Sequence, residues 1–136
     1  MENEQQGTRL KPEPQSRPIR VFFDGAGSRP NGDGSGYAWI CPDSNEKAVR
    51  RVSGLTNNQA EYRGFLAALE QVPTDGEVEI FSDSQLICSQ FDGKYRVKDE
   101  TLQALLSEVR SVISGKRLKV TLTWVPRSRN LAGKLL

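Results

Sequence analysis

The 136-residue sequence contains no histidine, and this absence excludes several kinds of active site. Serine–histidine and cysteine–histidine nucleophiles, histidine general bases and zinc–histidine centres all need an imidazole ring. Catalysis must therefore use carboxylates, amides, hydroxyls, lysines, arginines or bound metal ions. Only two cysteines are present, Cys41 and Cys88, which are too few for a disulfide framework and lack the spacing of a metal site. We expect both to be reduced thiols, buried or half-buried, in a cytoplasmic protein.

The sequence also lacks a long apolar run. No stretch approaches the ~20 apolar residues that span a bilayer, and the N-terminal residues 1–18 contain no apolar core of a secretory signal. The length fits a single domain on the prior of roughly 100–200 residues per domain. We expect a flexible polar tail at residues 1–18 and one domain at residues 19–136, working as a monomer with no membrane and no obligate protein partner.

Acidic residues are absent from the last part of the chain. The net charge is only +2, but residues 115–136 hold six Lys or Arg and no Asp or Glu. This segment predicts a non-specific affinity for a polyanion that weakens with added salt.

What is present is a regular succession of strand and helix patterns. A β-branched and aromatic run predicts a strand at 19–23, apolar alternation predicts strands at 77–81 and 118–124, and two more are expected at 36–40 and 48–53. Three helices are expected: one capped by Asn57 or Asn58 and ending near residue 73, one over 84–91, and one from a cap at Asp99 to Gly115. The first three strands fit an antiparallel meander. The order predicts an α/β fold with a five-stranded mixed sheet, three strands antiparallel and two parallel, flanked by helices.

Three carboxylates occupy related places in this scheme. Asp24 ends the first strand, Asp83 follows the fourth, and Glu61 lies in the first turn of the first long helix. If the first and fourth strands are parallel neighbours, the two aspartates meet at one edge of the sheet, where the helix can deliver the glutamate. Such charges repel one another unless a cation neutralises them, and oxygen ligands favour Mg²⁺ or Mn²⁺. Two such ions support in-line attack of water on a phosphodiester without any imidazole.

Each of these carboxylates also has an ordinary structural interpretation. Asp24 before Gly25 is typical of a turn, Glu61 of a solvated helix charge and Asp83 of a helix cap. Their joint placement at the ends of a parallel strand pair is what favours the metal site.

Four ordered blocks in the chain resemble type 1 ribonuclease H over residues 19–136. They are Asp24-Gly25-Ala26, Thr56-Asn57-Asn58-Gln59-Ala60-Glu61, Ser82-Asp83-Ser84-Gln85-Leu86 and Trp124-Val125-Pro126-Arg127-Ser128-Arg129-Asn130. The resemblance implies the ribonuclease H-like fold and two Mg²⁺ or Mn²⁺ ions. It also implies endonucleolytic cleavage of RNA paired to DNA, leaving 5′-phosphate and 3′-hydroxyl ends.

The chain departs from the family at the fourth metal ligand, which is usually an aspartate. Matched from Asn130, that position is Lys134, or Gly133 if the match slides by one residue, and no Asp or Glu follows Glu108. We therefore hypothesise a D-E-D-N set of catalytic metal ligands, namely Asp24, Glu61, Asp83 and Asn130. Gly25 is predicted as a further metal ligand. An amide brings no charge, so one ion should bind more weakly, and Mn²⁺ is the expected preference. The alternative is that water fills the fourth position.

Other departures concern the loops. The loop after the fifth strand offers Arg127, Ser128 and Arg129 where many relatives carry a histidine; arginine can hold a phosphate but cannot shuttle a proton. The short link at residues 92–98 predicts the compact form without a basic protrusion, and the family's last helix is absent or a stub.

Hybrid duplexes are recognised through 2′-hydroxyl and phosphate contacts. The residues expected to bind the substrate are Gly27, Ser28, Arg29, Thr56, Asn57, Asn58, Gln59, Ser84, Gln85, Arg127 and Arg129. The amides at 57–59 have helix capping as their alternative role, and both Trp39 and Trp124 are expected in the core. Two other functions stay open: a hybrid-binding module that has lost turnover, and another nuclease of the same fold, such as a resolvase or exonuclease.

Overall fold

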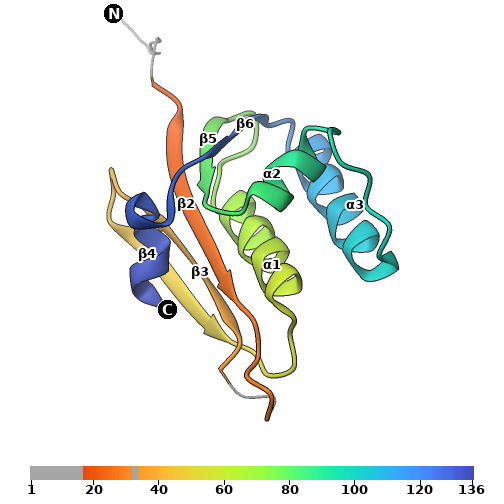
Figure 1. Cartoon of the computed structure of the whole chain (residues 1–136). Coiled ribbons are helices and arrows are strands. Elements are labelled where there is room, and N and C mark those ends of the chain that lie inside the picture. Colours follow the sequence, from red (N-terminus) through yellow and green to blue (C-terminus); the bar gives the residue numbers. More distant parts are fainter. Residues whose placement is uncertain (1–16, 32–33) are drawn as a thin grey trace, which may run out of the picture.

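The structure is a computed structural model that describes residues 17–31 and 34–136. The tail expected at residues 1–18 lies outside the described residues, apart from Arg17 and Pro18 (Figure 1).

A five-stranded sheet forms the centre of the domain. Its strands are β2 (Ile19–Ala26), β3 (Gly36–Cys41), β4 (Glu46–Arg51), β5 (Glu77–Ser82) and β6 (Lys119–Trp124), in the spatial order β4-β3-β2-β5-β6 (Figure 1). The pairs β2–β3 and β3–β4 are antiparallel, whereas β2–β5 and β5–β6 are parallel. The predicted mixed sheet is confirmed, and β2 is its central strand.

Three helices cover one face of this sheet. They are α1 (Asn57–Glu70), α2 (Gln85–Phe91) and α3 (Glu100–Gly115). Helix α1 packs on β2 and β3, and α3 packs on α1. The face of α1 that packs on the sheet is apolar, and its Tyr62, Phe65 and Leu69 are fully buried. The rings of Phe23 and Phe65 stack at 5.0 Å between their centroids, which joins the central strand to this helix.

The C-terminal segment covers the opposite face. Two short 3₁₀ helices, η1 (Arg127–Arg129) and η2 (Leu131–Leu135), follow β6, and η2 packs on β2 and β3 (Figure 1). Ala132 is buried there with Phe22 and Ala38. The segment after β6 thus adds apolar packing to this face of the sheet.

Local details differ from the predicted boundaries. The cap of α1 is Thr56, not Asn57 or Asn58: the Thr56 hydroxyl accepts from the Gln59 N–H at 3.1 Å, and the Gln59 side chain accepts from the Thr56 N–H at 3.0 Å. This reciprocal pair is a capping box. Strand β2 continues beyond the predicted turn to Ala26 because it still pairs with β3 there. Pairing with β3 likewise places β4 two residues earlier than expected.

The predicted burial holds for most of the residues named in advance. Cys41 and Cys88 are free and buried, and Trp39 is buried as expected. The expectation for Trp124 is wrong, because 43% of this residue is exposed at the end of β6. Within the described residues, the helices are too short or too polar to cross a membrane.

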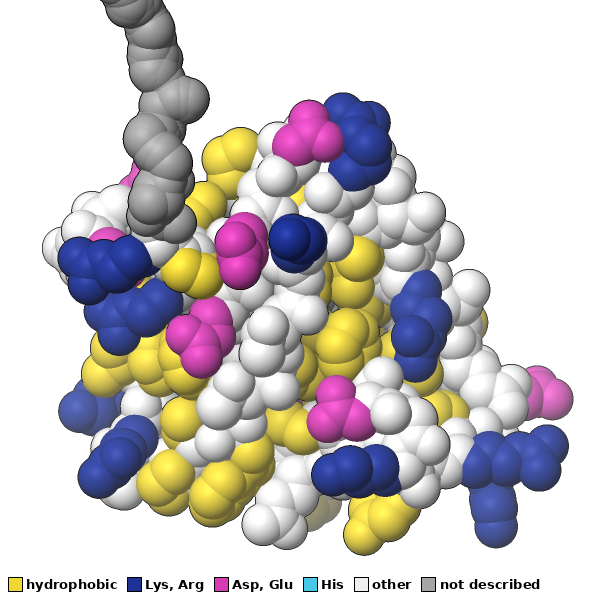
Figure 2. Space-filling model, turned by 90° about the horizontal axis from the view of Figure 1, so that it is seen from above, with side chains coloured by type: hydrophobic (Ala, Val, Ile, Leu, Met, Phe, Trp, Pro, Cys, Tyr) yellow, Lys and Arg dark blue, Asp and Glu magenta, His cyan; other side chains and the backbone are white. Residues whose placement is uncertain are grey.

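The end of the sheet where β2 begins carries charges of both signs. Figure 2 looks onto this end and shows acidic and basic side chains interspersed. Ion pairs join Arg20 to Asp43 at 2.9 Å and Arg117 to Asp75 at 2.6 Å. The Lys116 ammonium donates to the carbonyl oxygens of Leu69 and Glu70. Lys116 and Arg117 of the basic C-terminal segment thus make contacts within the domain.

Candidate active site

Parallel pairing of β2 and β5 brings two aspartates to the same edge of the sheet. The last pair in the register is Phe22 with Phe81. Asp24 lies two residues beyond Phe22 in β2, and Asp83 lies two residues beyond Phe81, directly after β5, so the two aspartates come to the same level. Functional groups at the carboxyl ends of parallel strands are a recurring feature of α/β sheets.

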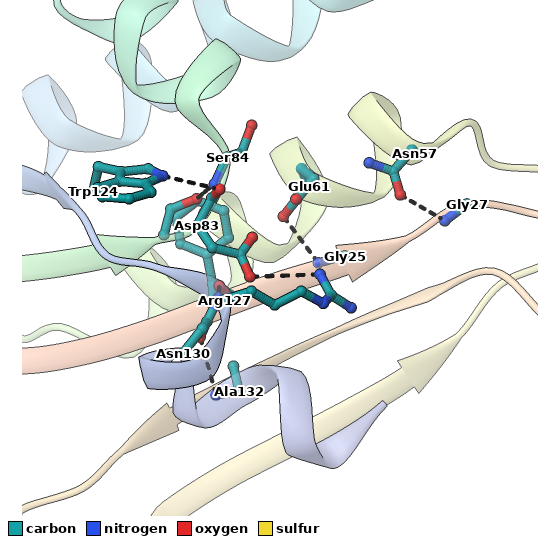
Figure 3. A network of polar contacts seen from close by, with 12 residues as sticks. Gly25, Gly27, Asn57, Glu61, Asp83, Ser84, Trp124, Arg127, Asn130 and Ala132 are labelled. Atoms are coloured by element: carbon teal, nitrogen blue, oxygen red, sulfur yellow. Dashed lines mark hydrogen bonds and ion pairs between the residues drawn. The ribbon is translucent and has the colours of Figure 1, made fainter.

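Helix α1 delivers Glu61 to this edge because two glycines let it approach β2 closely. A Cβ atom on Gly25 would lie 2.3 Å from the backbone of Ala60 and Glu61, and one on Gly64 would lie 2.9 Å from the Asp24 carbonyl oxygen. The Gly25 N–H then donates to Glu61 Oε1 at 3.0 Å (Figure 3). Gly64 was a signal that the sequence analysis missed, since a glycine inside a helix often marks a packing contact.

The three carboxylates form one buried cluster. One oxygen atom from each of Asp24, Glu61 and Asp83 lies within 4.8 Å of those of the other two. Asp24 and Glu61 are 1% and 3% exposed, and the Asp83 side chain is 7% exposed. The predicted convergence of these three residues is therefore what the structure shows.

Burial disfavours ionisation in this cluster. Loss of water raises the pKa of Glu61 to about 9, and the nearby charges of Asp24 and Asp83 add to the rise. Burial, with the charge of Asp83, also raises the pKa of Asp24. Both effects favour the neutral acid over the carboxylate unless a cation enters.

The cluster fits a divalent cation by its unsatisfied oxygens. Asp24 Oδ1, Asp24 Oδ2 and Asp83 Oδ2 are buried without a hydrogen-bond donor. Unpaired buried acceptors are costly, and carboxylate oxygens are the ligands that Mg²⁺ and Mn²⁺ prefer. Asp24, Glu61 and Asp83 are the residues that would hold such an ion.

Two further side chains contact Asp83. Arg127 in η1 places Nη1 3.5 Å from Asp83 Oδ2 while 77% of its side chain is exposed. The indole N–H of Trp124 donates to the Asp83 carbonyl oxygen at 3.1 Å (Figure 3). The sequence analysis named the arginine but missed this role of the tryptophan, because strand alternation predicts only that a side chain faces the core.

Asn130 is buried beside the cluster, but backbone groups engage its amide. Its Nδ2 donates to the Phe23 carbonyl oxygen at 2.9 Å, and its Oδ1 accepts from the Ala132 N–H at 3.1 Å. These bonds tie η2 to β2. The proposed roles of Asn130 and Gly25 as metal ligands stay predictions.

Most residues predicted to bind the substrate lie near the edge of the sheet that holds the carboxylates. The Gly27 N–H donates to Asn57 Oδ1 at 3.3 Å, and the Ser28 N–H donates to the Leu55 carbonyl oxygen, so the loop after β2 adjoins the start of α1. Thr56 and Gln59 are engaged in the capping box. Ser84 caps α2 by accepting from the Ile87 N–H. The remaining predicted contacts are half-buried Asn58 and the exposed Arg29, Gln85 and Arg129.

Comparison with known proteins identifies relatives of this arrangement. The family described as "Reverse transcriptase-like" matches residues 22–136. The bifunctional protein Rv2228c of Mycobacterium tuberculosis is 34% identical over 119 residues, which are 82% of this chain and 32% of that protein. Ribonuclease HI of Halobacterium salinarum is 31% identical over 118 residues, 82% of this chain and 58% of that protein. The chain thus spans about a third and somewhat over half of these two relatives.

Solved structures agree with the sequence matches. LC11-RNase H1 in complex with an RNA/DNA hybrid superposes with a TM-score of 0.75 at 27% identity, covering 87% of this chain and 92% of that one. RNase H1 from Halobacterium salinarum gives a TM-score of 0.73 at 28% identity, with 88% and 94% covered. The fold and the compact form without a basic protrusion are shared with these structures. The chain therefore belongs to the reverse transcriptase-like family, as an RNase H-like domain homologous to ribonuclease HI.

Proposed function

We propose that this protein is an endoribonuclease that hydrolyses the RNA strand of RNA/DNA hybrids with two divalent metal ions. The observation that carries the proposal is the buried cluster of Asp24, Glu61 and Asp83, within 4.8 Å of one another and rich in oxygens without donors. Homology to ribonuclease HI, and the hybrid bound to one structural neighbour, support the choice of substrate. The expected products carry 5′-phosphate and 3′-hydroxyl ends.

Divalent cations held by these oxygens would supply charge neutralisation and Lewis acidity for attack by water on the phosphodiester. The protein holds the three carboxylate side chains in place before the substrate binds. The Gly25 N–H fixes the Glu61 carboxylate, and the Trp124 indole fixes the backbone at Asp83. Rigid ligands keep the donor oxygens close together despite their mutual repulsion.

Arg127 is suited to binding a phosphate at the edge of the cluster. Its guanidinium is largely exposed and lies next to Asp83, so a bound phosphodiester can take over the ion pair. Because arginine stays protonated, it does not shuttle protons. We expect the proton for the departing oxygen to come from water.

Recognition of the RNA strand fits the start of α1. Gly27 and Asn57 lie next to each other there, and a Cβ on Gly27 would lie 2.5 Å from the Asn57 backbone nitrogen. Backbone and amide groups at this junction can contact 2′-hydroxyls, which distinguish RNA from DNA. Such contacts read the shape of the hybrid and not its base sequence.

A second function, hybrid binding with little turnover, is favoured by one feature. Among the described residues the cluster has three carboxylates, and the positions where the family resemblance implies a fourth hold Gly133 and Lys134. A cluster with less negative charge binds cations more weakly. The protein would then still bind the RNA/DNA hybrid but cleave it slowly.

A panel of end-labelled substrates separates these functions. RNA/DNA hybrid, duplex RNA, duplex DNA and a four-way DNA junction are incubated with the protein in EDTA, Mg²⁺ or Mn²⁺. We expect cleavage of the hybrid alone, in metal alone, with 5′-phosphate on the products. Hybrid binding without cleavage in either metal would establish the second function. Cleavage of the junction or of duplex DNA would contradict both.

A further inference from the structure

The Asp24 carboxylate faces Gly133 across the space between β2 and η2. A Cβ atom built on Gly133 would lie 3.1 Å from Asp24 Oδ2. Apart from the glycine's neighbours in its own turn, the Asp24 carboxylate is the only group of the described residues within 4 Å of that position. Asp24 itself is 1% exposed, and both of its carboxylate oxygens lack a hydrogen-bond donor. A side chain at position 133 would therefore begin beside an unsatisfied metal-ligand oxygen.

Asn130 is a poorer candidate for the missing ligand position. Its Nδ2 is bonded to the Phe23 carbonyl oxygen and its Oδ1 to the Ala132 N–H, so the amide plane is fixed by two backbone groups. An aspartate at position 130 would bring a carboxylate oxygen against the Phe23 carbonyl oxygen in place of a donor. The bonds of Asn130 explain its burial without a metal.

Resting on the proposed function, we propose that Gly133, not Asn130, marks the unfilled fourth position of the metal centre. The free protein then binds one divalent cation firmly. A second cation binds weakly, because Gly133 supplies no oxygen ligand beside Asp24.

Counting metal ions in the full chain without substrate tests this assignment. Mn²⁺ is titrated into wild-type protein, Gly133→Asp and the matched control Gly133→Asn, and free Mn²⁺ is followed by its EPR signal. Asparagine has the size of aspartate but no charge, so it reproduces the crowding near Asp24. We expect one firmly bound ion in wild type and in Gly133→Asn. Gly133→Asp should bind a second ion, with its affinity raised at least about tenfold.

Asn130→Asp is the competing variant. If Asn130 were the fourth ligand, this variant would gain the second ion, whereas our assignment predicts no gain and a lower melting temperature. Two firmly bound ions in free wild type, a gain in Asn130→Asp, or equal binding by Gly133→Asp and Gly133→Asn would each overturn the assignment. The number of ions bound by wild type is measured without any variant. It therefore still tests the assignment if the Gly133→Asp protein fails to fold. Absence of Mn²⁺ binding by wild type would overturn the proposed function together with this inference.

Discussion

Burial without hydrogen-bond donors governs the behaviour of the three carboxylates at the residue scale. Asp24 and Asp83 expose little side-chain surface. Neither carboxylate oxygen of Asp24 has a hydrogen-bond donor, and Asp83 Oδ2 has only its 3.5 Å ion pair with the exposed Arg127. Such groups destabilise a metal-free protein, because desolvated charge is costly unless it is paired. We therefore expect the cluster to lower the stability of the protein until a cation binds.

This cost predicts an unusual pH dependence of the metal-free protein. The pKa of Glu61 is about 9 in the fold, against roughly 4.3 in an unfolded chain. Between these values the folded protein binds more protons than the unfolded one, so the free energy of unfolding must fall as pH rises from about 5 to about 9. Urea unfolding in EDTA at pH 5, 7 and 9 measures this trend.

Glu61→Gln is the control for that trend, since its amide has a similar size and does not titrate. The variant should lose much of the decline with pH and be more stable than wild type at pH 9 in EDTA. If the free energy of unfolding fell equally steeply with pH in both proteins, Glu61 would not be the source of the decline. Added Mg²⁺ should stabilise wild type most at high pH, where cations compete least with protons.

At the scale of elements, the contact between α1 and β2 determines where Glu61 lies. The helix approaches the strand over Gly25 and Gly64, and neither position has room for a Cβ without displacing backbone. The same contact allows the 3.0 Å bond from Gly25 to Glu61. The same two glycines therefore determine both the packing of α1 on β2 and the position of the Glu61 carboxylate.

Substituting Gly25→Ala tests this coupling. The added methyl would lie 2.3 Å from the backbone of Ala60 and Glu61, so α1 must move away from β2. We expect a loss of roughly 2 kcal/mol or more in the free energy of unfolding and weaker metal binding. Gly115→Ala is the matched control because nothing lies within 4 Å of its added Cβ. It should be neutral or stabilising by up to about 1 kcal/mol, as measured by urea unfolding of both variants.

The start of α1 gives a second prediction at this scale. Thr56→Ala removes the hydroxyl that accepts from the Gln59 N–H, and it should lower the free energy of unfolding by about 1 kcal/mol. Thr56→Ser keeps an acceptor and should stay close to wild type. If serine and alanine were equally destabilising, the loss would come from the threonine methyl group and not from the cap. Urea midpoints of the three proteins decide between these outcomes.

At the scale of the whole molecule, the sequence was sufficient to predict the sheet, its helices and the three converging carboxylates. A β-branched and aromatic run marked the central strand and alternation marked the last two, and the chain order constrained the parallel pair that brings Asp24 to Asp83. Exact boundaries depended on pairing: β2 runs past its predicted turn because β3 continues beside it. The exposure of Trp124 and the engagement of Asn130 could not be predicted, since both depend on where the C-terminal segment folds back.

The distribution of basic residues gives a prediction for the whole domain. Lys119 begins β6 and pairs with Glu77 at the start of β5, so it lies at the opposite end of these strands from Asp83. Arg129 lies in η1, in the segment after β6 that reaches the carboxylates. Arg129→Gln should weaken hybrid binding and lower the slope of log affinity against log salt by about one. Lys119→Gln removes the same charge and should leave the slope unchanged. Titrations in EDTA from low to high salt measure both, and equal effects would contradict this placement of the binding face.

The central claim is that Asp24, Glu61 and Asp83 form the metal site of a ribonuclease that cleaves RNA in hybrids. Its most direct test is cleavage of a labelled RNA/DNA hybrid by wild type and Asp83→Asn in EDTA, Mg²⁺ and Mn²⁺. Asparagine keeps the shape of Asp83 but removes its charge. We predict cleavage by wild type in metal only, and a loss of at least about a hundredfold in Asp83→Asn, on the order of 3 kcal/mol of transition-state stabilisation. Equal cleavage by the two proteins, or cleavage by wild type in EDTA, would contradict the claim.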